Sequence, residues 1–215
     1  MTTRSRQEVE ADNIRVMGAD LGMAFSVLDH NVIELHVLWK QYRELFCNDS
    51  EVVALLNRTA GLFFNVVQDE LWDSVLLGIL RLTDKSKTIG KPNLTLAALQ
   101  SLVPESELKE SVMKLVEIAE QKTSGAREHR NQRIAHQDYN YGMNRDSYLL
   151  EDINVQMVEE MLSAIRAVMH CFEVHFNMPD TRYEGFKDST GARLLVAKLQ
   201  KFESLERTFE NARLD

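Results

Sequence analysis

The sequence contains few of the residues that interrupt helices, with only 3 prolines and 9 glycines among its 215 residues. This scarcity leaves little room for long loops or low-complexity tracts. Its two cysteines, Cys47 and Cys171, both lie in apolar helical patterns, so we expect buried, reduced thiols and no disulfide. The chain also lacks Cys-x-x-Cys and His-Glu-x-x-His spacings, so we expect neither a metal site nor a cofactor.

Long hydrophobic runs are missing as well. No apolar stretch approaches the ~20 residues that a membrane span needs, and Met1–Arg6 does not resemble a signal peptide, so we expect a cytoplasmic protein without membrane contacts. The net charge of -8 argues against non-specific nucleic-acid binding over the whole surface, although it permits a local basic site. The length favours one domain over residues 1–215, with a long N-terminal helix (1–50), a core (51–178) and a C-terminal helix (179–215).

Apolar residues at helical spacing fill most of the chain. A seam with a period of 3.5 residues predicts a helix over Asp12–Phe46 that lies along another helix. The seam consists of Ile14, Leu21, Leu28, Leu35 and Tyr42, and of Phe25, Val32, Trp39 and Phe46. Asp49 or Ser50 can then cap a second helix, predicted over Glu51–Leu82, in which Ala60, Phe63 and other apolar residues recur three and four apart.

The rest of the chain predicts shorter helices separated by polar loops. No segment alternates as a strand does, so we predict an all-α fold, an up-and-down helical bundle. The expected positions are a cap at Thr95, Pro104 in the first turn of the next helix, an interruption at Ser124-Gly125, a start at Asp152 or Asn154, and a last helix over Gly191–Arg213.

The stretch "RNQRIAHQD", Arg130 to Asp138, concentrates residues that can do chemistry. Arg130 and His136 are about 600° and ~9 Å apart on a straight helix, so they cannot form a tight pair within one helix. A site that uses both needs a distorted helix start, or a second copy of the chain across a dimer axis. Such a site suits cleavage of an RNA phosphodiester by its own 2′-hydroxyl, with histidine moving the proton and arginine binding the phosphorane oxygens. Alternatively, these residues form the polar face of an amphipathic helix.

The same stretch resembles the signature of the HEPN superfamily, in which an arginine and a polar residue precede a histidine. Upstream, "FFNVVQDELWDSVLLGILRLTDKS" and "NLTLAAL" are similar to the abortive-infection type U branch, and the likeness covers about Leu62–Asp138. The resemblance implies a helical bundle, usually a homodimer with its two motifs facing each other. It also implies metal-independent endoribonuclease activity in a toxin–antitoxin or phage-defence setting, with RNA as substrate and an antitoxin protein as a further partner.

The resemblance assigns roles to individual residues. Arg130 and His136 would be catalytic, and Asn131 would orient the phosphate or the histidine. Two other interpretations stay open: a catalytically silent HEPN module that binds nucleotides, RNA or a partner protein, and an oligomerisation bundle built on the long first helix.

Several nearby residues are candidates for support. Arg133 shares a helical face with His136, or is a surface charge paired with a carboxylate. Arg81 and Asp84 in "RLTD" form either a helix-end ion pair or part of the cleft wall. Tyr139 can stack on a base or cap the end of the bundle. We expect the helical histidines elsewhere to be structural: His30, His36, His170 and His175.

Overall fold

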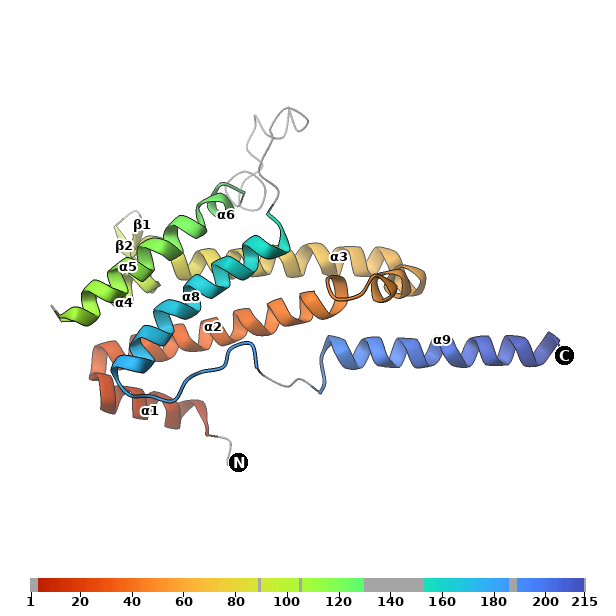
Figure 1. Cartoon of the computed structure of the whole chain (residues 1–215), viewed down its shortest axis with the longest axis horizontal. Helices are drawn as coiled ribbons and strands as arrows, with labels where there is room; N and C mark the ends of the chain where they lie inside the picture. Colours follow the sequence, from red (N-terminus) through yellow and green to blue (C-terminus); the bar gives the residue numbers. More distant parts are fainter. Residues whose placement is uncertain (1–3, 89, 105, 130–152, 186–188, 215) are drawn as a thin grey trace. The chain divides into compact units, whose positions relative to one another are not determined.

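The structure is a computed structural model that describes residues 4–88, 90–104, 106–129, 153–185 and 189–214. Within these residues the fold is all-α apart from one pair of two-residue strands (Figure 1). The elements in order are α1 (Arg6–Met17), α2 (Ala19–Phe46), α3 (Ser50–Thr83), β1 (Lys87–Thr88), β2 (Lys91–Pro92), α4 (Leu96–Ser101), α5 (Glu107–Lys122), α6 (Ser124–His129), α8 (Val155–His175) and α9 (Ala192–Leu214). The predicted all-α helical bundle is therefore confirmed.

The chain forms two compact units, and each is described by itself. Unit 1 comprises Met1–Leu35 and Leu76–Tyr183, and unit 2 comprises His36–Val75 and Glu184–Asp215. The prediction of one domain over residues 1–215 stays a prediction.

Unit 1 is built around an apolar core between helices. In Figure 1, α5 and α8 lie side by side, and α4 packs against α5. The first half of α2 joins them, since the Phe25 and Phe172 rings lie 5.8 Å apart. Its largest fully buried side chains are Phe25, Leu28, Leu76, Ile79, Leu80, Leu96, Leu99, Met161, Leu162, Ile165 and Phe172. Each contributes about 1.5–3 kcal/mol on leaving water, so this core dominates the stability of unit 1.

The first long helix is broken where the sequence predicted continuity. Gly18 has a φ of +88°, so α1 ends at Met17 and the chain turns before α2. A Cβ atom on Gly22 would lie 2.5 Å from the carbonyl oxygen of Asn13, so α1 packs directly on the backbone of α2. The prediction of one helix over Asp12–Phe46 is therefore wrong, because a glycine can adopt a left-handed turn that a hydrophobic pattern does not reveal. The seam itself is confirmed from Leu21 to Tyr42, since its members there are buried.

The second long helix, α3, has the predicted bounds, but not all of the apolar residues that were predicted to be buried along it are buried. Ala60 has non-helical angles (φ -160°, ψ 65°), which place a kink in the helix. Ala60 is exposed, and the Phe63 side chain is 62% exposed, although both were predicted on the buried stripe. The kink interrupts the rotation of 100° per residue on which that prediction depended.

The shorter helices test the predicted caps. Thr95 accepts a hydrogen bond from the Ala98 amide (3.3 Å), and Asn154 accepts one from the Met157 amide (3.0 Å), so both caps are confirmed. The placement of Pro104 in a first helical turn is wrong, because Ser106 is the N-cap and α5 begins after it.

Unit 2 has its own apolar cluster. The C-terminal helix α9 packs there, as the Ala192 amide donates to Oε1 of Gln41 (2.6 Å) and the Arg58 guanidinium pairs with Glu203 (2.8 Å). The Trp39 and Trp72 rings lie 6.2 Å apart in the same unit. The buried cluster contains Leu45, Val52, Leu56, Phe64, Ala192 and Val196. The predicted last helix is confirmed, with bounds within a residue of those expected.

Two further predictions concern the burial of the two cysteines and the absence of a membrane span. Neither cysteine forms a disulfide, but Cys47 is exposed, so its predicted burial is wrong. It lies in the turn after α2, where the apolar pattern ends. Cys171 is half-buried, and this burial raises the pKa of its thiol. None of the described helices combines the length and the apolar character that a membrane crossing requires.

Candidate functional site

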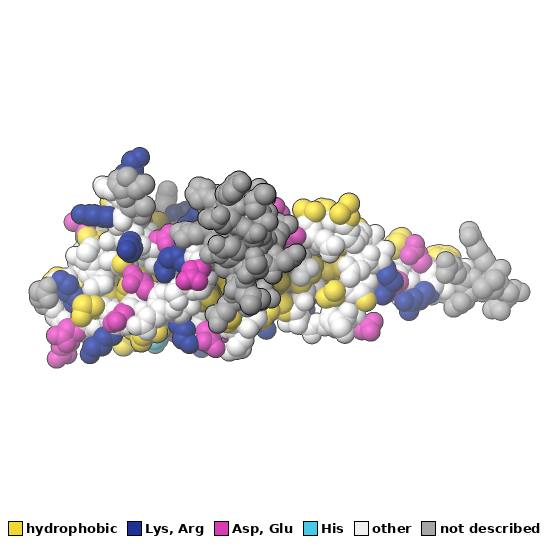
Figure 2. Space-filling view, turned by 90° about the horizontal axis from the view of Figure 1, so that it is seen from above, with side chains coloured by type: hydrophobic (Ala, Val, Ile, Leu, Met, Phe, Trp, Pro, Cys, Tyr) yellow, Lys and Arg dark blue, Asp and Glu magenta, His cyan; other side chains and the backbone are white. Residues whose placement is uncertain are grey.

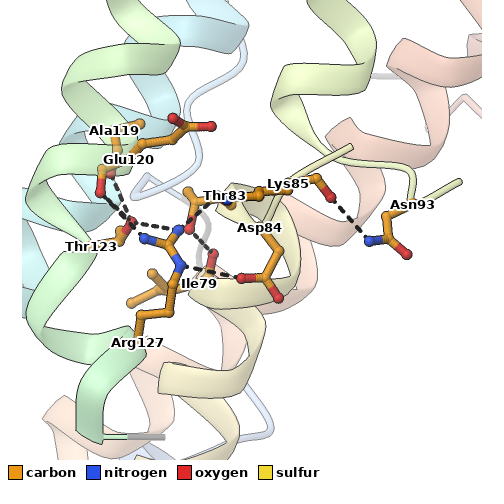
Figure 3. Close-up of polar contacts among 9 residues, drawn as sticks. All are labelled: Ile79, Thr83, Asp84, Lys85, Asn93, Ala119, Glu120, Thr123 and Arg127. Atoms are coloured by element: carbon orange, nitrogen blue, oxygen red, sulfur yellow. Dashed lines mark hydrogen bonds and ion pairs between the residues drawn. The ribbon is translucent and has the colours of Figure 1, made fainter. Parts of the chain in front are cut away.

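Most of the predicted site residues lie outside the described residues. These are Arg130, Asn131, Arg133, His136 and Tyr139, and the described chain stops at His129 and resumes at Ile153. The structure does describe the scaffold that leads into this stretch, which consists of the end of α3, the end of α5 and the short helix α6 (Figure 3).

The side chain of Arg127 fixes α6 to this scaffold. Its guanidinium donates to the carbonyl oxygen of Thr83 (2.8 Å) at the end of α3 and to that of Glu120 (3.5 Å) near the end of α5. It also pairs with Oδ1 of Asp84 (3.3 Å) and contacts Oγ1 of Thr123 (3.4 Å). Figure 3 shows the guanidinium between the two helix ends, facing all four groups. One side chain on α6 therefore connects the ends of α3 and α5.

The electrostatics of this arrangement are favourable. The last carbonyl groups of a helix lack partners and carry partial negative charge, so a cation there is stabilising. The hydroxyl groups of the buried residues Thr83 and Thr123 donate within their own helices, to the Ile79 carbonyl (3.0 Å) and the Ala119 carbonyl (2.9 Å). The Glu120 carbonyl accepts from both the Thr123 hydroxyl (3.3 Å) and Arg127 (3.5 Å), whereas the Thr83 carbonyl receives its bond from Arg127 (2.8 Å).

The two described candidates of the "RLTD" segment behave differently. Asp84 lies just after α3 and pairs with Arg127, whereas Arg81 is exposed and its side chain forms no ion pair within the described chain. The interpretation of this segment as an Arg81–Asp84 ion pair is therefore wrong. Arg127, not Arg81, is the partner, because it approaches from α6 while Arg81 faces solvent. A catalytic support role for either residue stays a prediction.

The loop after α3 holds Asp84 in place. Asn93 bonds back to the loop twice, as its Nδ2 donates to the Lys85 carbonyl (3.0 Å) and its amide to the Ser86 carbonyl (2.8 Å). Strands β1 and β2 pair antiparallel, and Gly90 between them adopts a φ of +76°, which a tight turn requires. The polar loop predicted after α3 thus contains a short antiparallel strand pair.

Sequence reasoning missed Arg127. Its partners Thr83 and Asp84 come more than forty residues earlier in the chain, so no local pattern indicates them. The one available signal is its position, three residues before Arg130, which is close to one helical turn.

Charged side chains of both signs are scattered over the face that Figure 2 shows. On the face shown in Figure 2, Lys and Arg side chains are interspersed with Asp and Glu side chains. With this mixture and a net charge of -8, any nucleic-acid binding would need a local basic site.

The comparison with known families is decisive for classification. The described scaffold and the stretch "RNQRIAHQD" both fall within residues 19–189, which match the HEPN family model described as AbiU2. The chain therefore belongs to the HEPN class of helical proteins. Within that class its family is AbiU2, whose name denotes an abortive-infection module. No curated protein and no solved structure gives a significant match.

Proposed function

We propose that this protein is a metal-independent endoribonuclease of the HEPN type that acts in phage defence or as the toxin of a toxin–antitoxin pair. The observation that carries the proposal is the AbiU2 match over residues 19–189, which encloses the Arg-Asn-x-x-x-x-His stretch from Arg130 to His136. The anchorage of α6 by Arg127 supports it, since a chemical step needs its residues on a rigid support.

In the proposed mechanism the RNA supplies its own nucleophile. His136 takes the proton of the 2′-hydroxyl or returns one to the 5′-oxygen, and Arg130 donates two hydrogen bonds to the phosphorane oxygens as charge develops. Asn131 orients the phosphate or the histidine. The products are an RNA with a 2′,3′-cyclic phosphate and an RNA with a free 5′-hydroxyl, and no metal takes part.

The first test is cleavage of RNA in EDTA. We expect the purified protein to cut single-stranded RNA and to leave 2′,3′-cyclic phosphate ends, identified by mass spectrometry. His136→Ala should lower the rate by at least about 100-fold, which is the usual contribution of a general acid or base. The matched control is His175→Ala, which removes an exposed histidine on α8 and should leave the rate unchanged. Cleavage by the His136→Ala protein at the rate of the unmodified protein would refute the proposal.

A second test addresses the composite site of a homodimer. If one cleavage site takes Arg130 from one chain and His136 from the other, a mixture of the inactive Arg130→Ala and His136→Ala proteins contains dimers with one intact site. Mixing should therefore restore part of the activity. Two variants that stay inactive together, in a verified mixed dimer, would rule out a site that takes one Arg130 and one His136 from different chains.

The alternative is a catalytically silent HEPN module. It predicts measurable RNA or partner binding with no cleavage at any protein concentration, and cells that tolerate overexpression. A blank cleavage assay together with saturable RNA binding would favour this alternative.

A further inference from the structure

A second cluster of chemically capable side chains lies in unit 1, near the C-terminal end of α8. His170 and Glu173 are one turn apart on that helix, and Asp180 comes from the segment that follows it. Nδ1 of His170 lies 3.4 Å from a carboxylate oxygen of Glu173 and 3.4 Å from Oδ1 of Asp180. All three atoms lie within 4.8 Å of one another. His170 is about 22 Å along α8 from the start of that helix at Val155.

These separations match the dimensions of a metal centre. Zinc bonds to histidine nitrogen and carboxylate oxygen measure about 2.0–2.2 Å, so neighbouring ligand atoms of a tetrahedral ion lie roughly 3.4 Å apart. Both distances from His170 Nδ1 have this value. The Asp180 side chain is 62% exposed, so its carboxylate can rotate to adjust the third separation.

Glu173 supplies an independent reason for a cation at this place. Its side chain is only 2% exposed, and among the described residues the basic side chain that lies against it is the imidazole of His170. The Thr181 amide donates to Oε1 (3.2 Å), which orients the carboxylate and leaves Oε2 toward His170. A buried carboxylate is costly unless a strong partner or a metal neutralises it.

A second carboxylate adds to the negative potential. Asp29 on α2 accepts a hydrogen bond from the Tyr183 hydroxyl (2.6 Å). Burial raises the pKa of Asp29, the bond from Tyr183 opposes this shift, and the charge of Glu173 raises the pKa further. The burial of Tyr183 and the charge of the neighbouring Asp29 raise the pKa of the Tyr183 hydroxyl, so this hydroxyl stays a hydrogen-bond donor.

A cavity gives access to the cluster. It has a volume of about 380 Å³ and is lined by residues that include Arg166, His170, Glu173, Asp180 and Tyr183. A hydrated ion can enter such a space, and water can remain there as a ligand.

We propose that His170, Glu173 and Asp180 bind one divalent transition-metal ion of the zinc type, with water from the cavity completing a four-coordinate shell. The donor set of one imidazole and two carboxylates suits this class of ion. The ion links α8 to the segment Asn177–Tyr183 and stabilises unit 1. It takes no part in the proposed RNA cleavage.

The test is a zinc titration of chelator-treated, full-length protein by isothermal calorimetry, with native mass spectrometry for stoichiometry. We expect one zinc ion per chain and a rise in Tm of roughly 5 °C at saturation. Asp180→Asn should fold normally and bind zinc roughly 100-fold more weakly, since loss of even an outer-shell partner costs 10- to 100-fold. His170→Ala should behave in the same way. Cobalt(II) should give the visible absorption of a tetrahedral centre.

Two controls separate this site from adventitious binding. His30→Ala removes a histidine that also pairs with a carboxylate, Glu34 at 3.0 Å, but lacks a third ligand, and should leave zinc affinity unchanged. His136→Ala should leave it unchanged as well. Absence of binding by the unmodified protein, undiminished binding by Asp180→Asn and His170→Ala, or loss of binding in His136→Ala would each overturn the proposal. Because the readouts are heat and stoichiometry rather than RNA ends, either proposal can fail without the other.

Discussion

At the scale of single residues, Arg127 shows how one side chain can satisfy two helices. The last carbonyl groups of α3 and α5 have no partners within their helices, and a guanidinium presents several donors in a fixed plane. Arg127 uses them on Thr83, Asp84 and Glu120, in a half-buried position where hydrogen bonds are only partly screened by water. The residue therefore fixes α6, the last described helix before the motif in the sequence, to the ends of α3 and α5.

We expect Arg127→Ala to lower the free energy of unfolding by about 1–2 kcal/mol, because two helix ends and Asp84 lose their common donor. Arg127→Lys should recover only part of this loss, since one ammonium group cannot reach all four acceptors. The matched control is Arg81→Ala, which removes an exposed guanidinium near the end of the same helix α3 and should change stability by less than about 0.5 kcal/mol. Urea unfolding followed by circular dichroism measures both. Equal effects of the two alanine variants would refute the role given to Arg127.

At the scale of helices, the turn between α1 and α2 depends on two glycines with different tasks. Gly18 supplies a φ of +88°, and Gly22 lets the Asn13 backbone approach α2. The side chain of Asn13, which is buried, donates to Oγ of Ser26 on α2 (2.9 Å) and secures the contact. Close backbone approach, not a hydrophobic stripe, therefore sets how α1 packs.

Gly22→Ala should destabilise the docking of α1 by about 1–3 kcal/mol, because the added Cβ meets backbone atoms of Asn13 and Ile14 that have no room to shift. Gly61→Ala is the matched control, since the nearest atom to its Cβ lies 3.9 Å away, and it should be neutral or stabilise by up to about 1 kcal/mol. Hydrogen exchange over residues 6–17 reports the docking. Unchanged protection of α1 in Gly22→Ala would contradict the contact.

The same elements show what a sequence can predict. The caps at Thr95 and Asn154 were predictable because a cap is formed by residues three positions apart. The exposure of Phe63 was not predictable, since the kink at Ala60 depends on the packing of the whole helix. For the site, the spacing of Arg130 and His136 is visible in the sequence, whereas the contacts of Arg127 bring together distant segments.

At the scale of the whole molecule, each unit has its own apolar core. In unit 2 the core cluster includes Val196 from α9, which is 8% exposed, while its neighbour Leu195 is 41% exposed. These two adjacent residues therefore distinguish the buried face of α9 from its open face.

We expect Val196→Asp to cost unit 2 about 2–5 kcal/mol, because a charge would enter an apolar cluster without a partner. Hydrogen exchange should show lost protection over residues 36–75, with protection kept over residues 107–122 of unit 1. Leu195→Asp, the control on the exposed face, should keep both. Equal loss in the two regions would show that the units do not unfold separately.

The boundaries of the units have a consequence for inheritance. Two of the three boundaries fall inside helices, between Leu35 and His36 in α2 and between Val75 and Leu76 in α3, and the third falls between Tyr183 and Glu184 in the segment between α8 and α9. A crossover in the gene at either boundary inside a helix would join half a helix to foreign sequence, and moving one unit intact would require exchanges at all three boundaries. Recombination can therefore transfer the gene as a whole more easily than the part that encodes one of the two units.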